Sequence, residues 1–217
     1  MLKIKRFVCN MLQENTYVVS DDSHEAIVID CGAFFKEERA AITQYIEQNG
    51  LKPVRLLCTH GHFDHCCGND TIYTSYGLKP QAPRRDAWLM ETMVDQTQLI
   101  LGVKINIDVP PIGQYLDADD TIDFGNHRLK VLPTPGHTPG SVLFHIEEEH
   151  VVFSGDTLFK MSIGRTDFDQ GSYPDMMASL SQVVANLPPD TTVYTGHGPE
   201  TTIAYELAYN PYLSSRL

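Results

Sequence analysis

The sequence of 217 residues has no long apolar segment. No run of about 18 apolar residues, the length that a membrane-spanning helix requires, occurs in it, and its first residues lack the apolar stretch of a signal peptide. No stretch rich in glycine, serine or proline marks a linker, and no short-period repeat is present. We therefore predict a single domain over residues 1–217 that has no membrane partner.

Positive charge is also scarce. The chain has 16 lysines and arginines against 28 aspartates and glutamates, which gives a formal net charge of −12. Such a field repels phosphate backbones and anionic lipid headgroups, so we expect no nucleic-acid partner and no membrane partner. A small anionic substrate stays compatible with it, because the local charge of a metal site can outweigh the net charge.

The five cysteines are odd in number and do not form a disulfide-framework spacing. This usage is typical of the reducing cytoplasm, which is the location we predict. We expect the adjacent Cys66 and Cys67 to be buried as small apolar side chains. The chain also lacks a G-x-S-x-G elbow, a P-loop and a dinucleotide glycine fingerprint, which excludes the enzyme classes that depend on them.

The apolar pattern predicts a mixed α/β chain in which helices interrupt runs of strands. Helices are predicted at residues 35–48 and 175–187, and a helical region is predicted at about 83–101. Strands are predicted at residues 4–9, 17–20, 26–30, 54–58, 128–132, 142–146, 151–153 and 192–194.

The most specific pattern is the sequence Thr-His-Gly-His-Phe-Asp-His at residues 59–65. With 9 histidines in 217 residues, such a cluster arises by chance in about one chain in a thousand. In an extended loop, side chains two residues apart lie on the same side, so His60 and His62 can bind one metal ion. Asp64 and His65 can then bind a second metal ion. Imidazole and carboxylate are ligands suited to Zn, Fe, Mn or Co.

Three later turns each place one further candidate ligand beside a predicted strand. His137 lies in a Pro/Gly frame at residues 135–140, Asp156 follows the strand at 151–153, and His197 follows the strand at 192–194. Each alone is more often an ordinary turn residue. Together they supply the ligands that a two-metal site lacks after residues 59–65.

The order THxHxDH, GH, GD and GHG resembles the metallo-β-lactamase superfamily, and residues 137–141 and 154–159 resemble its glyoxalase II-like branch. The resemblance implies an α/β fold, a four-layer αβ/βα sandwich of two facing sheets flanked by helices. It also implies two divalent metal ions, with zinc favoured and iron or manganese as alternatives. The implied ligands are His60, His62 and His137 for metal 1, and Asp64, His65 and His197 for metal 2, with Asp156 bridging both.

The resemblance further implies a reaction. A hydroxide bridging the two metals would attack the carbonyl of a small anionic thioester, hydroxyacylglutathione-like, with Asp64 orienting it and accepting its proton. Asp30 would orient the site from behind its ligands, and Arg165 would bind a substrate carboxylate. Alternatively, Asp30 is an ordinary turn carboxylate at the end of a strand, and Arg165 is an ordinary surface cation. Because Asp156 replaces the Cys or Ser usual in lactamases, a lactamase is disfavoured, and the acidic charge disfavours a nuclease.

Three alternatives stay open. A mononuclear iron persulfide dioxygenase would use His60, His137 and Asp156 as its metal-binding face. A hydrolase of another ester or a lactone would use the same fold. A metal-binding or redox-sensing module without catalysis is disfavoured, because structural zinc sites are usually closed and rich in cysteine.

The chain differs from full-length glyoxalase II after Pro199. Only 18 residues follow Pro199, where full-length glyoxalase II carries a helical domain with further glutathione contacts.

Overall fold

The computed structural model describes residues 1–213 and contains two compact units. Unit 1 comprises Met1–Leu116 with Asp123–His127, and unit 2 comprises Asp117–Ile122 with the chain from Arg128 onward. The single domain over residues 1–217 stays a prediction, and its positions 214–217 lie outside the described residues.

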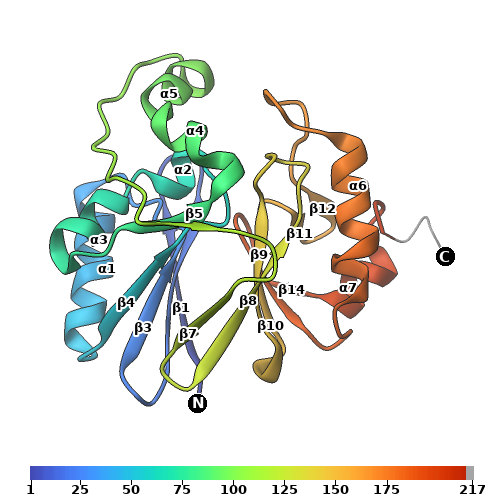
Figure 1. The fold of residues 1–217 in the computed structure, drawn as a ribbon, viewed down its shortest axis with the longest axis horizontal. Helices are drawn as coiled ribbons and strands as arrows, with labels where there is room; N and C mark the ends of the chain where they lie inside the picture. The colour runs from blue at the N-terminus through green and yellow to red at the C-terminus, as the bar shows by residue number, and fades with distance from the viewer. Residues whose placement is uncertain (214–217) are drawn as a thin grey trace. The chain divides into compact units, whose positions relative to one another are not determined.

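Unit 1 is built on a six-stranded sheet with the strand order β1-β2-β3-β4-β5-β6 (Figure 1). The pairs β1–β2 and β2–β3 are antiparallel, and the pairs from β3 to β6 are parallel. The strands are β1 Lys3–Cys9, β2 Glu14–Ser20, β3 Glu25–Ile29, β4 Lys52–Leu57, β5 Pro80–Pro83 and β6 Gln114–Leu116. The helices are α1 Lys36–Gln48, α2 Phe63–Cys66, α3 Asn69–Tyr76, the 3-10 helix Arg84–Asp86, α4 Ala87–Glu91 and α5 Met93–Leu101.

Helices α1 and α3 pack on this sheet through apolar side chains (Figure 1). Ile42 and Ile46 lie one turn apart on α1, so both face the same core, where they meet Leu56 of β4 and Ile72 of α3. A second apolar cluster, which includes Phe63 of α2 and Met90 of α4, lies in the part of the chain that follows β4. The segment carrying residues 59–65 is therefore fixed to the core by packing.

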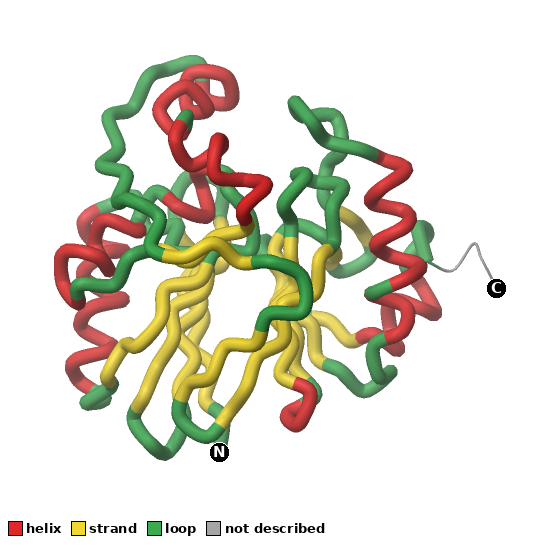
Figure 2. Tube along the Cα trace, viewed as in Figure 1, coloured by secondary structure: helices red, strands yellow, loops and turns green. Residues whose placement is uncertain are grey.

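Unit 2 contains most of a second six-stranded sheet, with the order β14-β13-β10-β9-β8-β7, and a separate hairpin of β11 and β12. Figure 2 shows α6 and α7 beside its strands, where Leu180 and Ile203 pack against Val152 and Val193. The strands are β7 Thr121–Phe124, β8 His127–Pro133, β9 Val142–Ile146, β10 Val151–Gly155, β11 Leu158–Phe159, β12 Ser162–Ile163, β13 Thr192–Thr195 and β14 Thr201–Thr202. The helices are α6 Tyr173–Gln182, α7 Ile203–Tyr209 and the 3-10 helices Glu147–Glu149 and Val184–Asn186.

Two multi-stranded sheets flanked by helices confirm the predicted α/β fold class. The helical region predicted over 83–101 consists of a 3-10 helix followed by two α-helices that part at Thr92. The Thr92 hydroxyl donates to the carbonyl oxygens of Trp88 at 2.8 Å and Leu89 at 3.3 Å, and this bonding competes with a continuing helix. The helix predicted at 175–187 ends at Gln182, and a short 3-10 helix follows. Among residues 1–213, no helix has the length and apolarity to cross a membrane.

Leu56 tests the packing that supports the segment after β4. Its side chain is fully buried, so Leu56→Ala should lower the free energy of unfolding by about 2–5 kcal/mol. Leu99 on α5 is 77% exposed, and Leu99→Ala should change it by no more than about 0.5 kcal/mol. Denaturant unfolding followed by circular dichroism measures both. Equal effects of the two substitutions would contradict the assignment of Leu56 to the core.

Candidate metal centre

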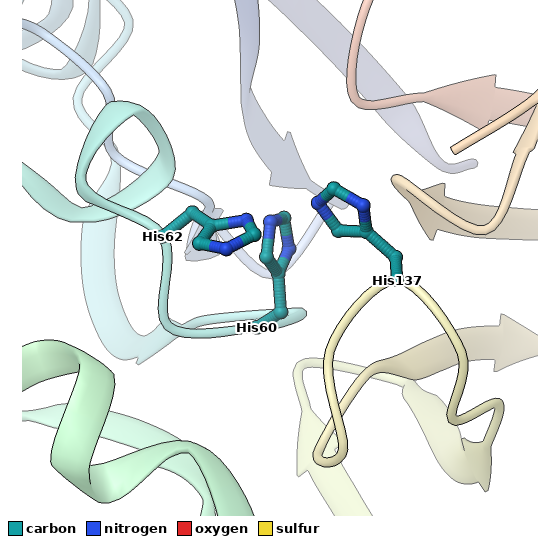
Figure 3. Close-up of side chains that lie close together, drawn as sticks. All are labelled: His60, His62 and His137. Atoms are coloured by element: carbon teal, nitrogen blue, oxygen red, sulfur yellow. The ribbon is translucent and has the colours of Figure 1, made fainter. Parts of the chain in front are cut away.

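The loop after β4 carries the first two predicted ligands in unit 1 (Figure 3). The rings of His60 and His62 are buried, with centroids 4.9 Å apart. Gly61 between them donates its N–H to Asp86 Oδ2 at 3.1 Å and accepts from Gln96 Nε2 at 3.4 Å. A Cβ at Gly61 would come within 2.7 Å of the Asp86 carbonyl oxygen. Glycine therefore lets the loop approach its support closely.

Asp30 fixes two residues of this region through a single carboxylate. Its Oδ1 accepts the Thr59 N–H at 2.7 Å, while Oδ2 accepts the Thr59 hydroxyl at 2.7 Å and lies 3.0 Å from His65 Nδ1. A carboxylate oxygen accepts hydrogen bonds, so His65 carries its proton on Nδ1 and presents Nε2 as a ligand atom. Ligand atoms of Asp30, His60 and His65 lie within 4.8 Å of one another.

Asp64 and His65 sit on the short helix α2, and both are buried. Asp64 Oδ2 lies 3.7 Å from His65 Nε2, so the two predicted ligands of metal 2 in this unit face each other. The side-chain amide of Asn10, in the turn between β1 and β2, donates to the carbonyl oxygens of Asp64 and Gly32 at 2.9 Å each. Asn10 thus ties the first hairpin to the ligand helix.

Glu14 on β2 adds an unusual buried acid near this group. Its side chain is fully buried, Oε2 accepts the Thr16 hydroxyl at 2.8 Å, and Oε1 has no hydrogen-bond partner among the described residues. Burial raises the pKa of Glu14 well above its usual value, and the nearby His65 opposes that shift. A raised pKa extends the pH range over which the Glu14 side chain is uncharged.

Unit 2 brings the other three predicted ligands together. Asp156 Oδ2 lies 3.4 Å from His137 Nε2 and 3.6 Å from His197 Nε2. His137, which Figure 3 draws on the loop after β8, has its Nδ1 2.7 Å from the main-chain carbonyl oxygen of Arg165. A carbonyl only accepts, so the His137 proton is on Nδ1. A Cβ at Gly164 would lie 1.8 Å from the Asp156 carbonyl oxygen, so only glycine allows this contact.

The side chain of Arg165 makes contacts of its own, in addition to the main-chain contact with His137. Nε and Nη2 donate to the two carboxylate oxygens of Asp167 at 2.9 Å each, and the guanidinium lies over the Phe168 ring at 4.2 Å. The Phe168 ring in turn meets the His137 ring edge-on, with centroids 5.9 Å apart. The Arg165 side chain is 64% exposed, and the Phe168 ring lies between its guanidinium and the predicted ligand His137.

The sequence did not predict the residues whose hydrogen bonds hold the metal ligands and their segments in position. Asn10 and Gln96 bind main-chain atoms of the ligand segments, and the Arg165 carbonyl binds His137. Their partners lie more than 25 residues away along the chain. No local pattern marks such residues, so only the folded chain identifies them.

The donor set fits divalent metal ions. Each unit presents imidazole nitrogens and carboxylate oxygens from buried or partly buried side chains. In two of the rings, a hydrogen-bond acceptor fixes the proton on Nδ1. Outer contacts of this kind set the tautomer and the direction of a ligating histidine. Nitrogen and oxygen donors of this type suit Zn, Fe and Mn, and no thiolate takes part.

The five cysteines are free and buried. A hydrogen bond with the Cys58 thiol and burial raise the pKa of Cys66, and burial raises the pKa of Cys67. Burial likewise raises the pKa of Cys9 to about 12 and that of Cys31. Protonated, inaccessible thiols are poor nucleophiles, in agreement with the apolar role predicted for Cys66 and Cys67.

The part of the chain that matches known proteins contains all the predicted metal ligands. Residues 9–197 match the family model of the metallo-β-lactamase superfamily. The chain is 32% identical over 215 residues to a Bacillus subtilis protein named probable metallo-hydrolase YqgX, covering 98% of each chain. It is 34% identical over 206 residues to hydroxyacylglutathione hydrolase GloC of Haemophilus influenzae, covering 94% of each.

Solved structures share the fold. The crystal structure of the BLEG-1 B3 metallo-β-lactamase has a TM-score of 0.89 and 32% identity, covering 98% of this chain and 100% of that one. TTHA1623 in a di-iron-bound form has a TM-score of 0.85 and 33% identity, covering 96% and 100%. ETHE1 from Myxococcus xanthus has a TM-score of 0.81 at 24% identity, covering 99% and 86%, and this likeness concerns the fold alone.

The burial of the cysteines makes a direct prediction about thiol reactivity. Ellman's reagent should label the native protein slowly, whereas the unfolded protein should release the colour of all five thiols. The variant Leu99→Cys, which places a thiol at an exposed position of α5, should react rapidly with one equivalent above the native background. A fast-reacting thiol in the unsubstituted native protein would contradict the assigned environment.

Proposed function

Because the chain belongs to the metallo-β-lactamase superfamily, we propose that it is a dinuclear metal-dependent hydrolase. The observation that carries the proposal is the carboxylate of Asp156, whose Oδ2 faces Nε2 of both His137 and His197. A carboxylate flanked by two imidazoles has the donor chemistry of a residue shared between two ions. Divalent metals bound there supply an activated water at neutral pH.

The proposed ligands are the seven residues that the family resemblance implies. Within unit 1 the contact of His65 with Asp30, and within unit 2 that of His137 with the Arg165 carbonyl, support the parts of the set that each unit carries. Zinc is the metal we propose, and iron is the alternative favoured by the di-iron form of the similar TTHA1623. The proposed assignment is His60, His62 and His137 for metal 1, Asp64, His65 and His197 for metal 2, and Asp156 for both.

Asp64 is the residue that we propose as the general base. Its carboxylate is buried on α2, and its main chain is held by Asn10. A carboxylate fixed in this way can orient an attacking water and accept its proton at Oδ2. No covalent intermediate with the enzyme is needed, and the thiols of the chain are buried.

The proposed substrate is a small anionic thioester. A relative 34% identical to this chain is named a hydroxyacylglutathione hydrolase, which supports this substrate class. A thioester carbonyl has weak resonance protection and a good leaving group. The guanidinium of Arg165 keeps donors beyond the two that Asp167 uses, and it can bind a substrate carboxylate.

The proposal is tested by screening the purified protein against thioesters, lactones, β-lactams and glutathione persulfide, with metal analysis of the same preparation. We expect thioester hydrolysis and two metal ions per chain. Hydrolysis of β-lactams instead would place the chain with the lactamase that it resembles structurally. Oxygen uptake on persulfide with one iron per chain would favour the dioxygenase that uses His60, His137 and Asp156.

Asp156→Ala tests the shared ligand. Without this carboxylate at least one ion should bind much more weakly, and hydrolysis should fall by a factor of about 100 or more. Metal content by mass spectrometry and the initial rate measure the two effects. Asp190→Ala, which removes an exposed carboxylate of the same unit, is the matched control and should change neither. Normal metal content and rate in Asp156→Ala would refute the role.

Arg165→Ala tests substrate recognition. The substitution leaves the main-chain carbonyl that holds His137, so only the guanidinium is lost. KM for a glutathione thioester should rise while kcat stays nearly unchanged, as expected for a contact equal in the ground and transition states. Arg128→Ala removes an exposed cation of β8 and should leave KM unchanged. An unchanged KM in Arg165→Ala would remove this residue from the substrate site.

A further inference from the structure

Thr59 lies between the end of β4 and the first predicted ligand, and its side chain is 1% exposed. Its hydroxyl oxygen is 2.7 Å from Asp30 Oδ2 and 3.0 Å from His60 Nδ1. The hydroxyl therefore stands between a carboxylate and an imidazole, within hydrogen-bond distance of both.

The direction of each hydrogen bond follows from counting protons. A hydroxyl has one proton, and Thr59 gives it to the Asp30 carboxylate. The contact with His60 then requires a proton on the imidazole Nδ1, with the Thr59 oxygen as acceptor. The tautomer with Nδ1–H leaves the lone pair on Nε2 for a metal ion.

We propose that Thr59 is a positioning residue that selects the tautomer and the ring direction of His60 by linking it to Asp30. The same carboxylate holds His65 directly, at 3.0 Å from Nδ1. One buried carboxylate then orients a ligand of metal 1 through Thr59 and a ligand of metal 2 without an intermediary. The inference rests on the proposed metal centre.

Two substitutions separate the hydroxyl from the shape of the side chain. Thr59→Val keeps the branched shape and its restricted rotamers but removes the link between Asp30 and His60. Thr59→Ser keeps the hydroxyl and loses only a methyl group. A role in packing alone predicts a larger effect for the serine variant, whereas the proposed role predicts a larger effect for the valine variant.

The decisive experiment is nitrogen-15 NMR of the histidine side chains in the full-length, metal-free chain. Imidazole nitrogen shifts and couplings show which nitrogen carries the proton. We expect the Nδ1–H form for His60 and His65 in the unsubstituted protein and in Thr59→Ser. In Thr59→Val, His60 should become a mixture of tautomers while His65 stays in the Nδ1–H form.

Zinc titration against a competing chelator supplies the second measurement. Thr59→Val should bind one of the two ions about 10- to 100-fold more weakly, the usual effect of losing such an outer contact, and Thr59→Ser should stay close to the unsubstituted protein. A His60 with Nε2–H in the unsubstituted protein, or an unchanged tautomer and zinc affinity in Thr59→Val, would overturn the proposal. If Thr59→Val fails to fold, the tautomer of the unsubstituted protein and of Thr59→Ser still decides.

The absence of hydrolase activity would be a separate outcome from the absence of the expected His60 tautomer. The tautomer is read in the metal-free chain without any substrate, so it does not depend on the reaction. A protein that hydrolyses no ester but shows the expected tautomers would retain the role of Thr59 and lose the proposed activity.

Discussion

The parallel pairing of β3 with β4 is the constraint on which the ligand loop of unit 1 depends. The register places Ile29 opposite Leu57, and the Asp30 N–H donates to the Leu57 carbonyl at 2.9 Å. The carboxyl ends of both strands therefore meet at one edge of the sheet, which is where parallel sheets usually carry their sites. Asp30, just past β3, can then accept two hydrogen bonds from Thr59, just past β4.

The conformation of Asp30 shows how strongly this edge is fixed. The residue has a φ of +50°, in the left-handed region that side chains other than glycine rarely adopt. Aspartate tolerates the region better than most residues, and three hydrogen bonds to its buried carboxylate stabilise it there. This strained residue is also the one that orients His65. A shift of Asp30 would disturb Thr59 and His65 together.

Unit 2 uses the same arrangement of strands. The parallel strands β10 and β13 pair Gly155 with Thr195, and the Gly196 N–H donates to the Gly155 carbonyl at 2.8 Å. Asp156 follows β10 directly and His197 lies two residues past β13, which explains why their side chains meet at 3.6 Å. In both units a parallel pair of neighbouring strands delivers two site residues that are distant in the sequence.

Much of this could be predicted from the sequence, for a physical reason. His60, His62, Asp64 and His65 are close in the chain, so their spacing is itself the signal. The strand at residues 142–146 and most of the others were also predicted, because buried strands are continuous apolar runs. The break at Thr92 was not, since it depends on a side chain bonding back to carbonyls within a segment that is otherwise rich in helix formers.

The contacts behind the ligands could not be predicted because their identity depends on the tertiary fold. Asn10 reaches Asp64 over 54 residues, and the partner of His137 is a main-chain carbonyl, which every residue type possesses. That difference has a consequence for the two predicted ligands His60 and His137. Thr59 orients His60 through a side chain, so one substitution can remove the contact. Arg165 orients His137 through its main chain, and its side chain is left to take another role.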